Sequence, residues 1–329
     1  MKISWRGAIG LALTAFLLWW VFKDVPWSEL VATLRGANVA LVILSVVTAT
    51  MIFPLRARRW RPILHAVAPN LPFGPLWRAT AMGFMANNIL PTGRMGELVR
   101  AYALTRETSV TFSAAFASLV VDRVFDGFVV LLLMVIAMLD PAFPEQVSAA
   151  TYAGGGAAVL IAIAAVLYAI VFFPDRLVRL YELFARRVAP RFEERGRVLL
   201  RAFADGLSVL RHPTRFLVVL WWALLLWVTQ AVAFWIMFKA LGIDAPFSAA
   251  LFVQGLIVLF VALPSTPGFF GLFEAAAKVG LVLYGVSESL AVAWGFIFHV
   301  LSLIPITLIG LYYLARTGMK LGELKSIQR

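Results

Sequence analysis

The sequence contains no cysteine, which excludes disulfide bonds, thiol catalysis and cysteine metal sites. It has only 3 histidines, and His65, His212 and His299 are too scattered to match the spacing of a metal site. A Gly-rich Walker loop, an HExxH helix and a G-x-S-x-G elbow are also absent from the sequence. We therefore expect no catalytic set, no metal site and no cofactor, and we predict that the protein is not an enzyme.

Charged residues are scarce as well. They make up 14% of the 329 residues, whereas 62% are hydrophobic, and the mean hydropathy is +0.90. Several apolar runs reach the length of about 20 residues that a helix needs to cross a hydrocarbon core. The composition predicts an all-α polytopic membrane protein, with too little polar sequence between its spans for a sizeable soluble domain.

The net charge of +12 does not indicate nucleic-acid binding, because the basic residues lie between apolar spans. The positive-inside rule predicts that 56–78, 174–215 and the tail 316–329 are cytoplasmic. The loop 140–150 has no Lys or Arg and 239–247 has only Lys239, so both should face outward. We expect a cell inner membrane protein with both termini cytoplasmic. No small-residue cleavage site follows the first apolar run, which we interpret as a retained span.

Uninterrupted spans are predicted at 5–22, 37–55, 124–139, 151–173, 216–238 and 289–314. Two further apolar regions, 79–123 and 247–284, are each broken by Pro and Gly. The first break reads Leu90-Pro91-Thr92-Gly93-Arg94-Met95-Gly96-Glu97. The second runs from Leu263-Pro264 through Pro267-Gly268 to Gly271 and Glu274. The charge count requires the first region to begin and end inside and the second to begin and end outside, which predicts two re-entrant hairpins. The alternative is that each region is two ordinary spanning helices joined by a turn.

The order span, span, hairpin, span then occurs twice with opposite orientation. This pattern predicts an inverted-topology repeat, about 5–140 and 151–315, whose substrate site lies near the midplane where the broken helices meet. The chain divides into a first repeat at 1–140, an outer loop, span and basic segment at 141–215, the rest of the second repeat at 216–315, and the tail. Within the basic segment, 174–211 has the apolar spacing of two amphipathic helices on the inner leaflet, and a basic linker is the alternative.

Polar and charged residues around the first break are candidates for binding a lipid head group. A helix break frees backbone amides, and the next half-helix presents its positive N-terminal end to an anion. Glu97 and Arg100 stand at i,i+3 and could pair. The alternative for Arg94 and Arg100 is that they are anchors at the membrane surface. The candidate head-group residues are Asn87, Asn88, Arg94, Glu97, Arg100 and Arg123.

A second set of residues is predicted to act in gating or coupling. Asp122 and Asp126 share a helix face at i,i+4, so they need a base between them. We favour a structural lattice with Arg94, Arg100 or Arg106 over proton or ion coupling. In the second hairpin, Glu274 and Lys278 have the i,i+4 order that favours an ion pair. His299 should bond to a neighbour rather than serve as a ligand or a proton carrier. The candidate gate or coupling residues are Asp122, Asp126, Pro267, Gly268, Glu274 and Lys278.

An ordered set of motifs resembles the flippase-like family related to the transmembrane part of lysylphosphatidylglycerol synthase. The matching pieces are Arg56-Ala57-Arg58-Arg59-Trp60, Asn87-Asn88-Ile89-Leu90-Pro91, Gly96-Glu97-Leu98-Val99-Arg100, Asp122-Arg123 with Asp126, and Pro267-Gly268-Phe269-Phe270-Gly271-Leu272-Phe273-Glu274. The chain departs from the family at Phe269, where the usual motif is Pro-Gly-Gly. These 329 residues show no counterpart of the soluble aminoacyl-transferase domain of the two-domain synthases, so we do not expect aminoacyl transfer.

The resemblance implies an inner-membrane protein that moves or binds lipids such as aminoacylated phospholipids, hopanoid-type lipids or polyprenyl-linked sugars. We therefore predict a flippase or transporter whose lipid head group crosses a cavity between the two hairpins. The alternative is a non-transporting protein that holds a lipid for a separate glycosyltransferase or lipid-modifying enzyme. An intramembrane enzyme is the weakest hypothesis, because the sequence shows no nucleophile with a base.

Overall fold

The computed structural model describes residues 5–23, 25–65, 67–90, 95–144, 173–188, 212–263 and 267–319, with short pieces between 154 and 197. All regular secondary structure in these residues is helical, which confirms the predicted all-α class. The second amphipathic helix, most of the predicted span 151–173 and the tail beyond 319 lie outside the described residues.

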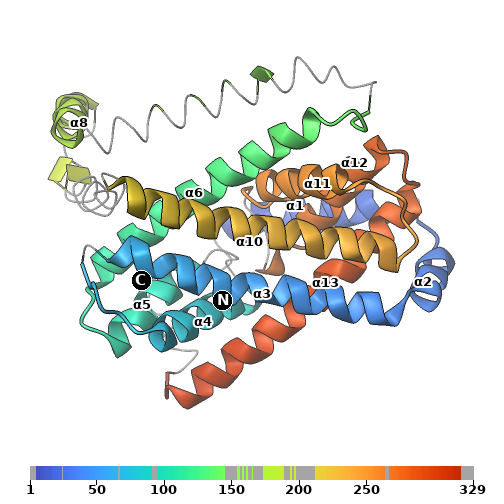
Figure 1. The fold of residues 1–329 in the computed structure, drawn as a ribbon, viewed down its shortest axis with the longest axis horizontal. Coiled ribbons are helices and arrows are strands. Elements are labelled where there is room, and N and C mark those ends of the chain that lie inside the picture. Colours follow the sequence, from blue (N-terminus) through green and yellow to red (C-terminus); the bar gives the residue numbers. More distant parts are fainter. Residues whose placement is uncertain are drawn as a thin grey trace.

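Four long helices run roughly along the long axis of the molecule (Figure 1). They are α3 (Val39–Leu64), α6 (Phe112–Met138), α10 (Pro213–Ala240) and α13 (Glu288–Arg316). Helices α3, α10 and α13 are long and apolar enough to cross a membrane. Helix α6 is as long, but its N-terminal half carries charged residues. Helices α3 and α10 lie side by side, and Ser45 on α3 donates a 2.7 Å hydrogen bond to the carbonyl of Ala233 on α10.

The first broken region forms an antiparallel pair of helices. Helix α4 (Phe73–Ile89) runs toward the break and α5 (Gly96–Glu107) runs back. Arg78 near the start of α4 pairs with Glu107 at the end of α5, while Asn87 near the end of α4 bonds to Gly96 at the start of α5. The Arg78–Glu107 pair therefore joins the outer ends of the two helices, which we call the open end of the hairpin. The Asn87–Gly96 bond lies at the opposite end, beside the break.

The second broken region has the same form. Helix α11 (Phe247–Phe260), the single turn η3 (Pro267–Phe269) and α12 (Leu272–Leu283) follow in order. The rings of Phe252 and Tyr284 lie 6.1 Å apart at the open end, and Gly280 on α12 faces Val253 on α11. In Figure 1 the α4–α5 pair occupies one end of the bundle and the α11–α12 pair the other.

The packing of the helices repeats between the two halves. Helix α3 contacts α4 as α10 contacts α11, and α5 contacts α6 as α12 contacts α13. The hairpins also cross over, since α4 packs on α13 and α11 packs on α6. Both crossings depend on a glycine: a Cβ at Gly310 would lie 2.3 Å from the Cβ of Met85, and one at Gly255 would lie 2.6 Å from Sδ of Met134.

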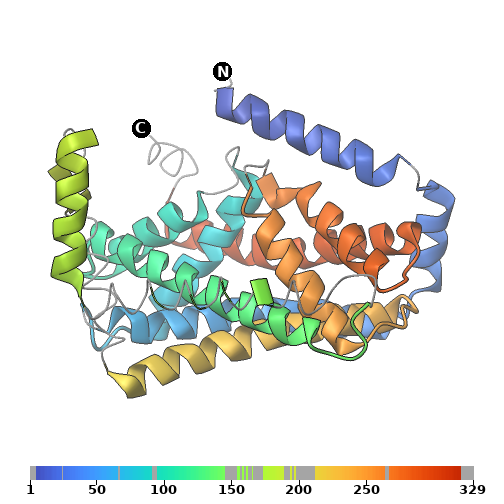
Figure 2. The ribbon, with the colours of Figure 1, turned by 90° about the horizontal axis from the view of Figure 1, so that it is seen from above.

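Three shorter helices lie around this core. Helix α1 (Trp5–Phe22) contacts α12, and α2 (Trp27–Gly36) contacts α13 at one end of the bundle. Helix α8 (Pro174–Val188), the first predicted amphipathic helix, lies at the other end with its axis across the long axis (Figures 1 and 2). Its Arg176, Arg179 and Arg186 are exposed. Helix α2 was not predicted, because its apolar pattern is short.

Three predicted boundaries differ from the structure. The start of hairpin 79–123 falls inside α4, which begins at Phe73. The span 37–55 is part of a helix that continues to Leu64, so Arg56 and Arg59 are helical residues and not loop residues. The boundary between hairpin 79–123 and span 124–139 falls inside α6, which begins at Phe112. The other described spans, 5–22, 216–238 and 289–314, coincide with α1, α10 and α13 to within three residues at each end.

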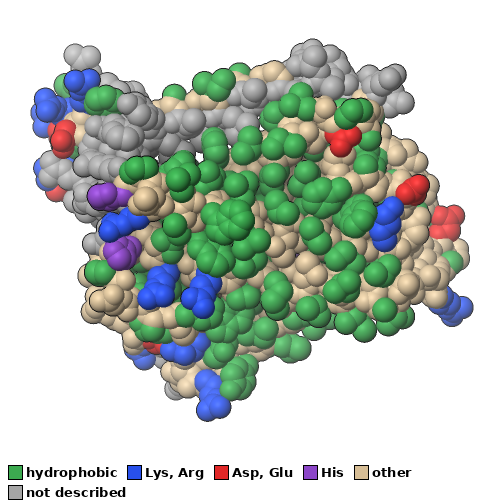
Figure 3. Space-filling model, in the orientation of Figure 1, with side chains coloured by type: hydrophobic (Ala, Val, Ile, Leu, Met, Phe, Trp, Pro, Cys, Tyr) green, Lys and Arg blue, Asp and Glu red, His purple; other side chains and the backbone are tan. Residues whose placement is uncertain are grey.

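The surface along the long helices is apolar. Figure 3 shows hydrophobic side chains spread over this face, with Lys and Arg gathered toward the end that carries α8. Exposed apolar residues include Ile43, Val47, Leu217 and Trp221, which are at least half exposed. Apolar exposure of this extent is what a protein surface in contact with lipid tails requires.

Candidate functional site

A buried cluster of ion pairs joins α3, α5 and α6. Arg56 and Arg59 reach it from α3, Arg100 from α5, and Asp122 and Asp126 from α6. Each of these five side chains is at most 5% exposed. Charged side chains at this depth are costly unless each finds a partner, so the cluster is a structural or functional centre of the protein. We call these five residues the ion cluster.

The helical spacing of the cluster explains its geometry. Arg56 and Arg59 stand three residues apart on one face of α3, and Asp122 and Asp126 stand four apart on one face of α6. Arg59 Nη2 lies 2.7 Å from Asp122 Oδ1, and Arg59 Nη1 lies 2.8 Å from Asp126 Oδ1, so this arginine bridges both acids. Arg56 pairs with Asp126 Oδ2 and lies 3.8 Å from Asp122.

Arg100 is held more loosely than the other cluster arginines. Its Nη1 is 3.4 Å from Asp122 Oδ2, its Nη2 is 3.4 Å from the hydroxyl of Thr80, and its Nε has no hydrogen-bond partner. The guanidinium carbon stands 4.5 Å from the ring centre of Trp60, which adds a cation–π contact. Arg100 therefore retains unused hydrogen-bonding capacity in a buried position.

The cluster reaches the surface through one ion pair, Arg123 on α6 with Glu97 on α5. Arg123 Nε donates a 2.9 Å hydrogen bond to Glu97 Oε1, and Arg123 Nη1 lies 3.3 Å from Asp126 Oδ2. The side chain of Arg123 is 42% exposed and that of Glu97 is 22% exposed. With this pair included, four arginines face three acids, which leaves one positive charge in excess (4 − 3 = +1).

The first break is closed by polar contacts. Asn87 Oδ1 accepts a 2.6 Å hydrogen bond from the backbone N–H of Gly96 and so caps α5 from the end of α4. Asn88 donates a 2.8 Å hydrogen bond to Thr307 on α13. The two asparagines predicted to bind a head group thus have structural partners here. Arg94, the remaining head-group candidate, lies outside the described residues.

The second break contains a carboxylate paired with an imidazole. Glu274 is fully buried. Its Oε2 accepts a 2.7 Å hydrogen bond from the N–H of Gly271, and its Oε1 is 2.7 Å from Nδ1 of His299 on α13. The His299 ring stacks on Phe273 at 4.3 Å and lies 4.8 Å from the ring of Phe270. The expected pair of Glu274 with Lys278 is wrong.

Lys278 instead pairs with Glu288 at the start of α13, with Nζ 2.6 Å from Oε2, and its ammonium lies 4.8 Å from the ring centre of Trp20 on α1. Likewise, Glu97 pairs with Arg123 and not with Arg100. Local i,i+3 and i,i+4 spacing favoured the wrong partners in both hairpins, because residues of the next helix compete for the same charges.

The turn between α11 and α12 has an unusual backbone. Gly268 and Gly271 have φ values of 70° and 83°, and Phe269 has a φ of 59°. Phe269 is the one non-glycine residue with positive φ among the described positions. It stands where the sequence departs from the Pro-Gly-Gly pattern, so the third position of that motif favours glycine for conformational reasons. The turn η3 packs against α4, which brings the second break to the first hairpin.

Several residues of this site escaped sequence reasoning. Arg56 and Arg59 follow an apolar run and carry the signature of a cytoplasmic loop, and only their shared face with Trp60 signalled a helix. Trp227 on α10 donates a 2.8 Å hydrogen bond to Asp126 Oδ1, and no local pattern signals it. The predicted lattice around Asp122 and Asp126 exists. It contains Arg100, one of the three arginines predicted for it, together with Arg56 and Arg59, which were not predicted. Among the described residues, no three His, Cys, Asp or Glu side chains could hold a metal ion.

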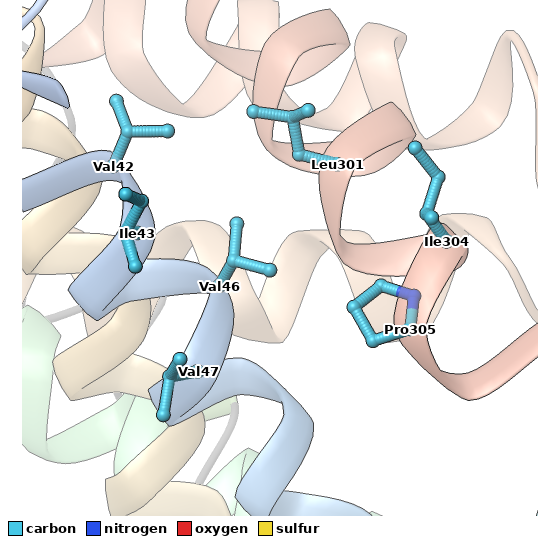
Figure 4. A pocket seen from close by; sticks show the side chains of 7 residues that line it. All are labelled: Val42, Ile43, Val46, Val47, Leu301, Ile304 and Pro305. Atoms are coloured by element: carbon cyan, nitrogen blue, oxygen red, sulfur yellow. The ribbon is translucent and has the colours of Figure 1, made fainter. Parts of the chain in front are cut away.

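An apolar groove lies between α3 and α13. Figure 4 shows Val42, Ile43, Val46 and Val47 of α3 facing Leu301, Ile304 and Pro305 of α13 across it. Ile43, Val47 and Ile304 are about half exposed, so the groove opens onto the apolar surface. Its seven lining side chains carry no polar group, so the groove is apolar throughout.

Comparison with known proteins agrees with these observations. The model of a family described as the lysylphosphatidylglycerol synthase TM region matches residues 7–310. A UPF0104 membrane protein of Methanothermobacter thermautotrophicus is 25% identical over 97% of each chain. A UPF0104 membrane protein of Pyrococcus horikoshii is 21% identical over 92% of this chain and 93% of its own. The glycosyltransferase AglD of Haloferax volcanii is 34% identical over 117 residues, which are 36% of this chain and 19% of that protein.

Proposed function

The chain belongs to the lysylphosphatidylglycerol synthase TM region family, and from this premise and the ion cluster we propose that it is a lipid transporter. The transported lipid carries an anionic head group, as in an anionic phospholipid or a polyprenyl phosphate. The protein moves this lipid across the inner membrane without covalent chemistry, with both of its termini on the cytoplasmic side.

The observation that carries the proposal is the single excess positive charge of the cluster and its exposure at one edge. Arg123 is held by Glu97 and Asp126, yet 42% of its side chain is accessible. A phosphate can take the place of Glu97 at this guanidinium, because arginine binds phosphate and carboxylate in the same bidentate manner. Arg100, with its partnerless Nε, supplies a second cation behind it.

The architecture supports an inverted repeat with two re-entrant hairpins. The packing pattern of α3–α6 recurs in α10–α13, and the two antiparallel pairs lie at opposite ends of the bundle. In each hairpin, a glutamate in the first turn of the second helix bonds to a residue of the long helix that follows. Glu97 bonds to Arg123, 26 residues further along the chain, and Glu274 bonds to His299, 25 residues further along. Transporters of this design place substrate between the broken helices.

Unsatisfied polar groups support a polar path in both halves. In the first half, the Nε atoms of Arg56 and Arg100 are buried without hydrogen-bond partners. In the second half, the side-chain amide nitrogen and oxygen of Gln254 on α11 are also buried without partners. Such groups are costly in an apolar interior unless a ligand or water satisfies them. The lipid tails stay outside this path, and the apolar groove between α3 and α13 has the composition to hold one of them.

Reconstitution tests the proposal. Purified protein in vesicles is supplied with labelled phosphatidylglycerol, phosphatidylcholine or polyprenyl phosphate, and label is followed from one leaflet to the other. We expect the anionic lipids to move faster than in empty vesicles. The Arg123→Gln variant should lose most of this movement, whereas the control Arg78→Gln, which opens the ion pair with Glu107 at the far end of the hairpin, should retain it. No movement above empty vesicles for all three lipids would refute the proposal.

A second candidate function rests on the relative named as a glycosyltransferase. In this alternative the chain presents a lipid-linked sugar precursor to a separate glycosyltransferase or lipid-modifying enzyme and does not transport it. Co-purification with such an enzyme, together with bound polyprenyl lipid and no movement between leaflets, would favour it over transport.

A further inference from the structure

We propose that the Glu274–His299 pair binds the proton that drives lipid movement, an inference that rests on the proposed function. The pair lies at the second break, where Glu274 begins α12 and His299 reaches it from the middle of α13. Both side chains are at most 5% exposed. Ionisable side chains inside a membrane protein are costly, and chains of Asp, Glu and His serve as proton relays in pumps and transporters.

The hydrogen bonds of the pair permit a change of charge without a change of partner. Glu274 accepts from Gly271 at Oε2 and from His299 Nδ1 at Oε1. With Nδ1 carrying a hydrogen, the ring can bind or release a proton at Nε2 while both bonds persist. The pair then has a net charge of 0 with the ring protonated and −1 with it neutral. One proton is gained or lost, and no covalent bond between heavy atoms changes.

The surroundings leave this pair electrically isolated among the described residues. Its ring neighbours, Phe270 and Phe273, are uncharged. Charged groups on its own and adjacent helices have other partners or stand at the helix ends. They are Lys278 with Glu288 on α12 and α13, Lys239 at the end of α10 with Asp244, Arg215 at the start of α10, Arg78 with Glu107 on α4 and α5, Lys23 after α1, Glu29 and Arg35 on α2, and Arg316 at the end of α13. Helix α3 contributes Arg56 and Arg59 of the ion cluster, with Arg58 and Arg61 near its end.

A proton fits the site better than a metal cation. Sodium, calcium and magnesium require several oxygen ligands, and here one carboxylate faces an imidazole. Both carboxylate oxygens already accept hydrogen bonds. Transition metals would need further ligands, and no group of three His, Cys, Asp or Glu occurs in the described part of the chain. The ligand is therefore the hydrogen ion.

The two halves differ in the residue that faces the glutamate of the hairpin, and this difference assigns proton binding to the Glu274–His299 pair. In the first half, Glu97 faces Arg123, a cation that stays charged at any physiological pH. In the second half, the related Glu274 faces His299, whose charge can change. An anionic head group that leaves Arg123 for the second hairpin meets a pair of net charge −1 when His299 is neutral and of net charge 0 when it is protonated, so protonation removes the repulsion. Movement of the anion is thereby tied to the uptake of a proton.

Histidine NMR tests proton binding without any transport measurement. The chain has 3 histidines, so the variant His65→Gln/His212→Gln leaves His299 as its one imidazole. We expect the ring nitrogens of His299, in full-length protein in lipid nanodiscs, to report the binding of one proton between pH 5 and 9. Glu274→Gln, which keeps the side-chain shape, should shift the midpoint. A ring whose protonation state is constant over this range would overturn the inference.

Transport under an imposed pH gradient tests the coupling. With the membrane potential clamped, we expect the wild-type rate to change by up to about tenfold per pH unit of gradient. His299→Gln should lose this dependence, and His65→Gln/His212→Gln should keep it. Lipid movement that ignores the gradient overturns the coupling and leaves the proposed function standing. Absence of lipid movement in every vesicle overturns the proposed function, and the coupling with it.

Discussion

Replacing Asp126 by Asn tests whether the ion cluster stabilises the fold through charge balance. Asp126 forms ion pairs with Arg56, with Arg59 at 2.8 Å and with Arg123 at 3.3 Å. It also accepts a 2.8 Å hydrogen bond from the indole N–H of Trp227. The asparagine keeps the size of the side chain but removes its charge. The net charge of the cluster with the Arg123–Glu97 pair then rises from +1 to +2, and three arginines lose a partner.

The expected loss is large because the affected charges are buried. Removing one member of a buried ion pair costs about 3–5 kcal/mol, since the remaining charge is left uncompensated. Arg56 is 3% exposed and Arg59 is fully buried, so water cannot screen them. We expect Asp126→Asn to lower the free energy of unfolding by this amount. The control Asp244→Asn, which removes a fully exposed partner of Lys239, should cost less than about 1 kcal/mol.

A double-mutant cycle separates charge balance from lost packing. The variant Arg56→Gln/Asp126→Asn returns the net charge to +1, so we expect it to recover about 1–3 kcal/mol relative to the sum of the two single variants. The free energies come from denaturant titrations of the protein in mixed micelles, with tryptophan fluorescence as the signal. Additive single losses, or an Asp126→Asn variant as stable as the wild type, would refute the role assigned to the cluster.

Two further substitutions test the breaks. Phe269→Gly should raise the free energy of unfolding by about 0.5–1 kcal/mol. The reason is that the strain of a left-handed backbone at Phe269 costs more than the added freedom of glycine in the unfolded chain. A less stable variant in the same titration would contradict this. Gly83→Ala should cost about 1–3 kcal/mol, since its Cβ would lie 2.2 Å from Cγ of Arg100 and 2.7 Å from the carbonyl of Gly96. Its control Gly127→Ala meets no atom within 4 Å and should be neutral or stabilising, so equal losses would argue against close packing of α4 on α5.

Much of the helical framework could be predicted from the sequence. Apolar length alone located α1, α10 and α13, and paired Pro and Gly residues located both breaks. The end of α3 could not be predicted in this way. A run of arginines after an apolar segment resembles a cytoplasmic loop, and it is helical here because Arg56 and Arg59 meet acids on α6 that lie 63 or more residues away in the sequence.

The pairing of the site residues was harder to predict for the same reason. Spacing on one helix identified Glu97 and Glu274 as important and gave each the wrong partner. The actual partners, Arg123 and His299, stand on the next long helix. Charged residues in lipid pair with whichever opposite charge tertiary packing brings closest, because an unpaired charge costs more there than any local preference gains. Local rules therefore identify which residues are charged and buried, and only the fold assigns their partners.

The exposure of the charged residues divides the site into a structural and a functional part. The five residues of the ion cluster are buried, and each contacts at least one other member, so a head group bound at Arg123 reaches Arg100 only when the helices around the cluster move apart. Arg123 and Glu97 are accessible and belong to the same charge network. Substitutions in the buried part should therefore lower stability and transport together. If the protein transports an anionic lipid as proposed, substitutions at Arg123 should lower transport in a protein that remains folded, and that result would place recognition of the anion at this edge.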